Sequence, residues 1–206
     1  MNTGFADMKK YAQSCQSDFW QAVFRAELNY LVQNLKGATD ILSVGCGPAI
    51  IETGLAEHGF NITGLDISQE ALNQTPDNIR TVVGSAEKMD FADDCFDAVI
   101  YVASLQFIKR YKQAVKETSR ILRSGGKLLI MLLNPESEFF CEKRKNPDSY
   151  INRIKHVNLK EIENVIAKFF SIETEYFLGI EGIEIFQSRD SDTASLYVIK
   201  GIKKKY

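Results

Sequence analysis

Short apolar segments alternate with amphipathic segments from residue 18 to residue 133, and this alternation limits the fold more than any other feature. Five segments have the length and composition of strands, at residues 40–45, 61–66, 79–83, 96–102 and 127–133. The segments between them, and residues 18–35 before them, have helical spacing or helix-capping residues. The fourth strand is apolar almost throughout, as expected of a strand buried on both faces. This order favours a parallel sheet with helices on both sides and right-handed crossovers.

The pattern changes after residue 135. A polar stretch covers residues 136–156, and a helix is predicted at residues 159–169. Two further strands are predicted at residues 171–178 and 195–202, joined by a polar loop. A length of 206 residues suits a single domain, so we expect these elements to extend the same sheet.

Charge and cysteine content narrow the classes of partner. The chain has 25 basic and 27 acidic residues, so its net charge of -2 offers no broad attraction for nucleic acid. Its four cysteines are widely spaced and form no CxxC pair, so we expect neither a metal site nor a disulfide framework. No apolar run reaches the roughly 18 residues of a membrane-spanning helix. We therefore expect a cytoplasmic protein with no nucleic-acid or membrane partner.

The segment from Leu42 to Ala49 carries the strongest sign of a ligand site. A strand there runs into Gly45 and Gly47, which have no side chain to keep a ligand away from the backbone. Asp66 ends the next strand, roughly 20 residues after Gly45, where an acid can accept hydrogen bonds from ribose hydroxyls. The alternatives are a purely structural glycine turn and an Asp66 that only caps the next helix. The combined spacing favours a ligand that contains a ribose.

Nicotinamide dinucleotides are one class of ribose-containing ligand. Their GxGxxG fingerprint, counted from Gly45, requires a third glycine at the position of Ile50. The chain also lacks a Tyr-x-x-x-Lys pair for hydride transfer. A nicotinamide-dependent oxidoreductase is therefore the less favoured interpretation.

Five motifs in order carry a resemblance to a known family: Val44-Gly-Cys-Gly-Pro-Ala49, Gly64-Leu-Asp-Ile-Ser68, Gly84-Ser-Ala-Glu87, Phe96-Asp-Ala-Val99 and Leu122-Arg-Ser-Gly-Gly126. Over roughly residues 35–135 the chain resembles the class I S-adenosylmethionine-dependent methyltransferases, especially their small-molecule branch. The resemblance implies an α/β fold, a three-layer Rossmann-like sandwich whose mostly parallel sheet has an antiparallel last strand. It implies S-adenosylmethionine as cofactor and S-adenosylhomocysteine as product.

The resemblance also implies roles for residues of the donor site. In that family the glycine loop, here Gly45 and Gly47, holds the methionyl part of the donor. The acid after the second strand, here Asp66, holds the ribose, and the next residue, Ile67, packs on the adenine. The backbone carbonyl of Val102 is expected to accept a hydrogen bond from the amino group of the donor.

Two positions depart from the family pattern. Ser85 stands where the family usually has an acid near the adenine amino group, so recognition of adenine is expected to rely on its hydroxyl, with Ala86 and Glu87 beside it. Ala49 replaces the usual third glycine, and we expect it to be tolerated as a small residue that already enters the helix.

Two weaker candidates precede the core. Tyr11 lies in a segment that often folds over the donor in this family, although an aromatic that only docks the first helix is equally compatible. Arg25 is a candidate partner of the methionyl carboxylate, although a solvated helix arginine is the commoner case.

The predicted organisation is one domain over residues 1–206. Residues 1–37 form an N-terminal helical cap, residues 38–135 a donor-binding core, and residues 136–206 a C-terminal part with an acceptor-side insertion and the last two strands. The predicted function is methyl transfer to a small-molecule acceptor by in-line displacement, and no general base can be named. The alternative is a binding module that holds the donor without transfer.

Overall fold

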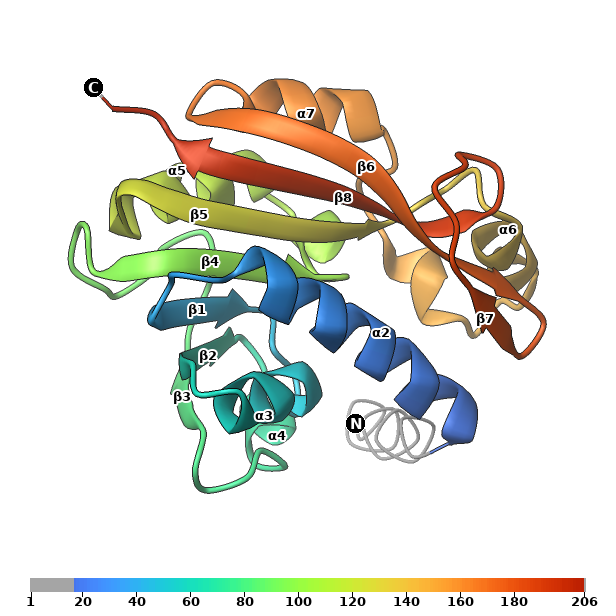
Figure 1. Ribbon diagram of the computed structural model, residues 1–206, viewed down its shortest axis with the longest axis horizontal. Helices are drawn as coiled ribbons and strands as arrows, with labels where there is room; N and C mark the ends of the chain where they lie inside the picture. Colours follow the sequence, from blue (N-terminus) through green and yellow to red (C-terminus); the bar gives the residue numbers. More distant parts are fainter. Residues whose placement is uncertain (1–16, 206) are drawn as a thin grey trace.

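The computed structural model describes residues 17–205, and its frame is one eight-stranded sheet in the order β3-β2-β1-β4-β5-β8-β6-β7 (Figure 1). Five strands are parallel: β1 (Asp40–Val44), β2 (Asn61–Asp66), β3 (Arg80–Val83), β4 (Phe96–Val102) and β5 (Leu122–Leu133). Three antiparallel strands complete the sheet: β6 (Phe170–Glu181), β7 (Glu184–Phe186) and β8 (Ala194–Lys203). The last strand runs antiparallel to β5, which confirms the predicted fold class.

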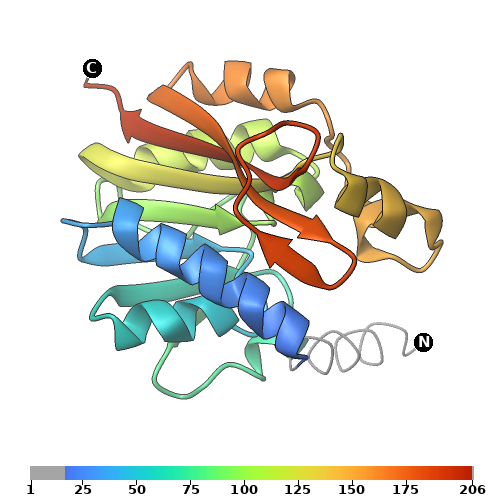
Figure 2. The same ribbon diagram turned by 45° about the vertical axis from the view of Figure 1, so that its right-hand side comes forward.

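Helices cover both faces of the sheet (Figure 2). One apolar cluster contains residues of α2 (Asp18–Asn34), α3 (Ile50–Glu57) and α6 (Glu138–Lys145). The other contains residues of α5 (Tyr111–Ile121) and α7 (Leu159–Ile166). The short elements are α4 (Gln69–Leu72) and the 3-10 turns η1 (Leu105–Phe107) and η2 (Tyr150–Arg153).

The central strands supply both clusters because successive side chains of a strand point to opposite faces. Leu128 and Ile130 of β5 belong to the cluster with α5, whereas Leu129 and Met131 belong to the cluster with α2. All four side chains are less than 5% exposed. Burial on both faces is the reason that such strands are apolar at consecutive positions.

Three boundaries differ from the sequence prediction. β5 begins at Leu122, directly after α5, and an irregularity in its pairing with β4 absorbs the glycines that we expected to precede the strand. The predicted polar loop before β8 contains β7, which follows a turn at Gly182 with a φ of +59°. The polar stretch before α7 contains α6 and η2, and α6 begins where the Ser137 hydroxyl accepts a hydrogen bond from the Phe140 amide.

α2 presents a stripe of buried residues to the sheet at helical spacing. Its N-cap is Ser17, whose hydroxyl accepts a hydrogen bond from the Trp20 amide. Val23, Glu27 and Leu31 are all buried on the face toward the sheet. The middle member of this stripe is a carboxylic acid, which is unusual for a core position.

Gln106 fixes the turn that follows β4. Its side chain is buried, its carbonyl oxygen accepts a hydrogen bond from the Leu133 amide at 2.8 Å, and its amide group donates to the Leu133 carbonyl at 3.1 Å. The same amide group donates to the His156 carbonyl at 3.3 Å. Gln106 thus ties the end of β4 to the end of β5 and to the segment before α7.

We expect Gln106→Leu to lower the free energy of unfolding by about 1 to 3 kcal/mol, because it leaves buried groups of Leu133 and His156 without their partners. Chemical denaturation would measure the loss. The matched control is Gln69→Leu at an exposed position of α4, and an equal loss in both variants would contradict this role for Gln106.

Candidate functional site

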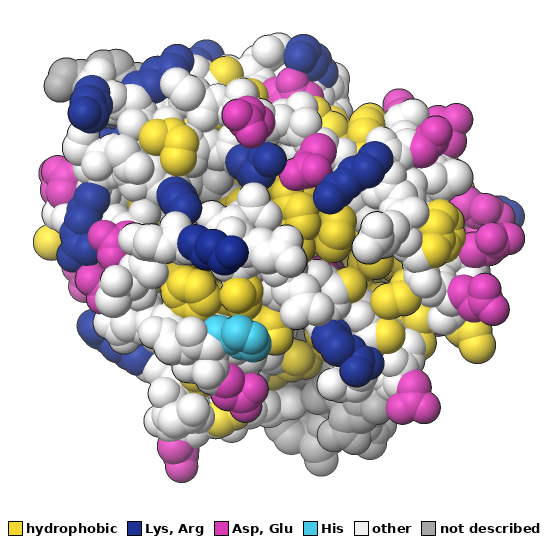
Figure 3. Space-filling model, in the orientation of Figure 1, with side chains coloured by type: hydrophobic (Ala, Val, Ile, Leu, Met, Phe, Trp, Pro, Cys, Tyr) yellow, Lys and Arg dark blue, Asp and Glu magenta, His cyan; other side chains and the backbone are white. Residues whose placement is uncertain are grey.

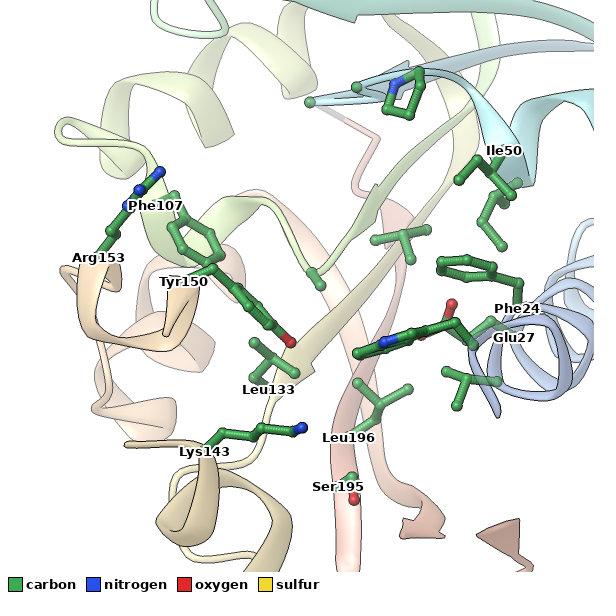
Figure 4. Close-up of a pocket in the computed structure, with 18 of the residues that line it drawn as sticks. Phe24, Glu27, Ile50, Phe107, Leu133, Lys143, Tyr150, Arg153, Ser195 and Leu196 are labelled. Carbon is green, nitrogen blue, oxygen red and sulfur yellow. The ribbon is translucent and has the colours of Figure 1, made fainter. Parts of the chain in front are cut away.

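A cavity of about 1150 Å³ opens at the carboxyl ends of β1, β2 and β4. Ligands of open parallel sheets lie at this edge, and ordinary ligand pockets measure roughly 300 to 1,000 Å³. One wall consists of α2 and the loop before α3, and the facing wall consists of α6, η2 and the turn after β4 (Figure 4). The size and the two walls provide room for a cofactor and a second small molecule.

The loop between β1 and α3 brings the backbone to the cavity. Gly45 and Gly47 have φ angles of +74° and +56°, a region that glycine enters without strain. A Cβ at Gly45 would lie 2.6 Å from the Cβ of Ser104, so only glycine fits between β1 and the turn after β4. A Cβ at Gly47 would meet no atom within 4 Å, which leaves this part of the backbone open to a ligand.

Ala49 has a φ of +59° and precedes the first residue of α3. Our expectation that this residue already enters the helix is therefore wrong. It occupies a left-handed position, which costs an alanine about 1 to 2 kcal/mol and explains why a glycine suits this position in related loops. The side chain of Ala49 is completely buried, and the free energy gained from that burial offsets part of this cost.

Asp66 joins this loop to the end of β2. One carboxylate oxygen accepts a hydrogen bond from the Gly47 amide at 2.8 Å, and the other accepts one from the Ser68 amide at 2.8 Å. Each oxygen keeps a further lone pair for a ligand. The Ser68 hydroxyl accepts a hydrogen bond from the Ala71 amide and caps α4, so Asp66 is not needed as the cap.

Two buried glutamates also line the cavity. Glu52 of α3 is 3% exposed, and its carboxyl accepts a hydrogen bond from the Ser43 hydroxyl. Burial, partly offset by that hydrogen bond, raises the pKa of Glu52 to about 7. Glu27 of α2 is 5% exposed, and burial together with the nearby Glu52 raises its pKa to about 8. Burial, with Glu52 and Asp66 nearby, also raises the pKa of the Cys46 thiol.

Aromatic side chains occupy both walls of the cavity. Trp20 and Phe24 of α2 stack with ring centroids 5.9 Å apart, and Phe139 of α6 meets Trp20 edge-on at 6.3 Å. On the facing wall, Phe107 and Tyr150 stack at 6.4 Å. All five rings line the cavity, and we call the part that they line its aromatic end.

The chain is similar in sequence to known methyltransferases. A family model described as a methyltransferase domain matches residues 42–130. The chain is 30% identical over 116 residues to demethylmenaquinone methyltransferase of Corynebacterium glutamicum, a match that covers 56% of this chain and 48% of that protein. It is 28% identical over 153 residues to the biotin biosynthesis bifunctional protein BioHC of Cellvibrio japonicus, a match that covers 72% of this chain and 30% of that protein. The chain thus spans less than half the length of these two relatives.

The fold is shared with solved structures. A Thermotoga maritima protein described as an S-adenosylmethionine-dependent methyltransferase and possible histamine N-methyltransferase superposes with a TM-score of 0.75. The two are 20% identical, and the match covers 95% of each chain. Residues 42–130 thus match the methyltransferase-domain family, and the chain shares the fold of a protein described as an S-adenosylmethionine-dependent methyltransferase. S-adenosylmethionine is the cofactor of this family, as the resemblance implied.

Four of the residues expected to bind the donor line the cavity: Gly45, Gly47, Asp66 and Val102. Ile67 does not line it and is 77% exposed beside Asp66. Sequence reasoning missed the buried acids. For Glu27, the sequence signal was its position four residues from both Val23 and Leu31, in the apolar stripe of α2.

Four other expected residues do not line the cavity: Ser85, Ala86, Glu87 and Arg25. Ala86 packs in the cluster with α5, and the Ser85 hydroxyl accepts a hydrogen bond from the Glu87 amide at 3.2 Å. The Glu87 carboxylate pairs with the Arg110 guanidinium at 2.7 Å, which lowers its pKa. Arg25 is exposed on α2, and Tyr11 lies outside the described residues.

Neither histidine lines the cavity: His58 pairs with the Gly54 carbonyl and His156 with the Ile108 carbonyl. Over residues 17–205, no cluster of three or more His, Cys, Asp or Glu side chains could hold a metal ion. In the same part of the chain, no helix combines the length and the apolar character needed to cross a bilayer.

The two loop glycines should respond differently to substitution. Gly45→Ala is expected to lower the free energy of unfolding by about 2 kcal/mol or more, since a left-handed alanine costs about 1 to 2 kcal/mol and the contact with Ser104 adds to it. Gly47→Ala should lower the free energy of unfolding only by the cost of a left-handed alanine, because its methyl group meets no protein atom. Equal melting temperatures for the two variants would contradict the close packing at Gly45.

The raised pKa of Glu27 predicts a pH-dependent stability. The folded protein binds more protons at this residue than the unfolded chain between pH 4.5 and about 8, so stability falls as pH rises through that window. Glu27→Gln removes this loss and should stabilise the protein at pH 9 by on the order of 3 kcal/mol, with no gain at pH 4. Thermal unfolding of both proteins across this range measures the difference. A gain that does not change with pH would contradict the shifted pKa.

Proposed function

We propose that this chain binds S-adenosylmethionine in the cavity and transfers its methyl group to a small-molecule acceptor by in-line displacement. The observation that carries the proposal is the carboxylate of Asp66, which holds the left-handed loop at Gly47 and faces the cavity with unused lone pairs. The family match supports the choice of cofactor. The alternatives are a binding module without transfer and, less favoured, a nicotinamide-dependent oxidoreductase.

The residues around the loop between β1 and α3 fit this cofactor. The open backbone at Gly47 can approach the methionyl part, and Asp66 can accept hydrogen bonds from ribose hydroxyls. The acids Glu52 and Asp66 lie beside the loop and suit a ligand that carries positive charge. When bound, S-adenosylmethionine supplies an electrophilic methyl group on a sulfonium. The protein then has to align the acceptor with that methyl group and exclude water.

The aromatic end of the cavity supports a small-molecule acceptor. Rings from α2 and α6 line it on two sides, and such an aromatic lining suits a small molecule that contains a ring. Acidic and basic side chains are interspersed on the face shown in Figure 3, without a broad basic surface for nucleic acid. Two relatives named above also act, by their names, in the biosynthesis of small molecules, biotin and menaquinone.

The proposal includes the organisation of the chain. The N-terminal cap, the donor-binding core and the C-terminal part each contribute to the one cavity, through Trp20, Gly47 and Phe139 respectively, which supports a single domain over residues 1–206. Cys46, Cys95 and Cys141 are free thiols, which supports the expected cytoplasmic location.

Ligand-dependent stability tests the choice of cofactor. We expect S-adenosylhomocysteine to raise the melting temperature and NAD to leave it unchanged, because a ligand that binds only the folded state stabilises it. A shift with NAD and none with S-adenosylhomocysteine would favour the oxidoreductase. Binding of S-adenosylhomocysteine without methyl transfer to any member of a broad acceptor panel would favour the binding module.

Asp66→Ala tests the residue that carries the proposal. We expect it to weaken S-adenosylhomocysteine binding by about 1 to 3 kcal/mol, because it removes the charged acceptor and releases the Gly47 amide. Calorimetry measures the affinity, and the exposed Asp77→Ala is the matched control. Unchanged affinity in Asp66→Ala would assign the ribose to another residue.

A further inference from the structure

Glu27 is a buried acid that has no partner among residues 17–205. The residue is 5% exposed and lines the cavity, and no hydrogen bond or ion pair joins its carboxyl to that part of the chain. Burying such a group is costly unless a charge or a donor meets it. Figure 4 shows Glu27 on the α2 wall, beside Phe24. The missing partner is therefore expected to come from a molecule in the cavity.

The surroundings of Glu27 favour a cation. Phe24 and Trp20 lie one and two turns before it on the same face of α2, and aromatic faces attract cations. The charged groups on its side of the cavity are the acids Glu52 and Asp66. The basic side chains in the lining, Lys143 and Arg153, lie on the facing wall in Figure 4.

The position of Glu27 places it on the acceptor side. Glu27 belongs to α2, the same helix that supplies the Trp20 and Phe24 rings of the aromatic end. Under the proposed function, the donor lies at the glycine loop, and the space beside these rings is left for the acceptor.

We propose that the acceptor of this enzyme is an amine, bound as an ammonium against Trp20 and Phe24 by the carboxylate of Glu27, which then takes its proton. This inference rests on the proposed methyl transfer. The N–H proton moves to the Glu27 carboxylate, and the freed nitrogen lone pair attacks the methyl group. The N–C bond forms as the C–S bond breaks, and its electron pair stays on the sulfur of S-adenosylhomocysteine. Glu27 afterwards returns the proton to solvent.

The acid strength of Glu27 agrees with this role. Burial and Glu52 raise its pKa to about 8, so Glu27 is mostly protonated at neutral pH before the amine binds. Binding of an ammonium reverses the desolvation cost and favours the ionised carboxylate. A protein at neutral pH should therefore release a proton from Glu27 when the amine binds.

Affinities of two matched probes test the recognition. Calorimetry on protein saturated with S-adenosylhomocysteine compares phenethylamine with phenethyl alcohol, which differ only in the amine and hydroxyl groups. We expect the amine to bind about tenfold more tightly or better, and Glu27→Gln to remove that preference. The control Glu57→Gln changes an exposed glutamate of α3 and should keep the preference.

The number of protons released when the amine binds distinguishes an ion pair with Glu27 from a purely structural role of this residue. Amine binding is measured in two buffers of different ionisation enthalpy at neutral pH. The wild-type protein should release close to one proton per amine bound, and Glu27→Gln should release none. The thermal unfolding of Glu27→Gln serves as the check that the variant is folded.

Three results would overturn the inference while the proposed function stands. The first is equal affinity of the two probes for the wild-type protein. The second is an amine preference that persists in Glu27→Gln. The third is a loss of about tenfold or more in S-adenosylhomocysteine affinity in that variant with the amine preference unchanged, which would assign Glu27 to the donor. Failure of S-adenosylhomocysteine to bind the wild-type protein would instead overturn the proposed function.

Discussion

The hydrogen bonds of the Asp66 carboxylate are the interaction on which the site depends. They join the Gly47 amide of the loop after β1 to the Ser68 amide at the start of α4. One side chain can reach both because parallel strands end at the same edge of the sheet. The adjacent Leu65 carbonyl accepts a hydrogen bond from the Gly45 amide at 2.7 Å and fixes the other side of the loop. The position of the loop backbone at the cavity follows from these contacts.

The buried acids show how the fold accommodates an unfavourable site. Glu27 and Glu52 each take a position in a helix where an apolar side chain would contribute to stability. The two large apolar clusters on the faces of the sheet compensate for this loss. Under the proposed function, positive charge in the ligands offsets the desolvation of these carboxyls.

Much of the fold could be predicted because its signals are local. The sheet order confirms the alternation of strands and helices, and the pairing of β5 with β8 confirms the antiparallel last strand that the family resemblance implied. Predictions were wrong where local signals compete. The glycines expected to precede β5 lie within it, since pairing with β4 extends the strand through them. The three-residue β7 is stabilised by pairing with β6, and three residues are too few to show a strand pattern in the sequence.

The sequence by itself determined the strand–loop–helix unit, with Gly45, Gly47 and Asp66 at the spacing of a ribose-binding site, because backbone conformation and strand length fix that geometry within one short segment. Only the tertiary structure decided the opposite end of the cavity. Trp20, Glu27 and Phe139 come from helices far apart in the chain, and packing on one face of the sheet brings them together. The spacing of these residues in the sequence does not indicate that they lie close together. The burial that distinguishes Glu27 from a solvated helix glutamate likewise exists only once α2 has packed.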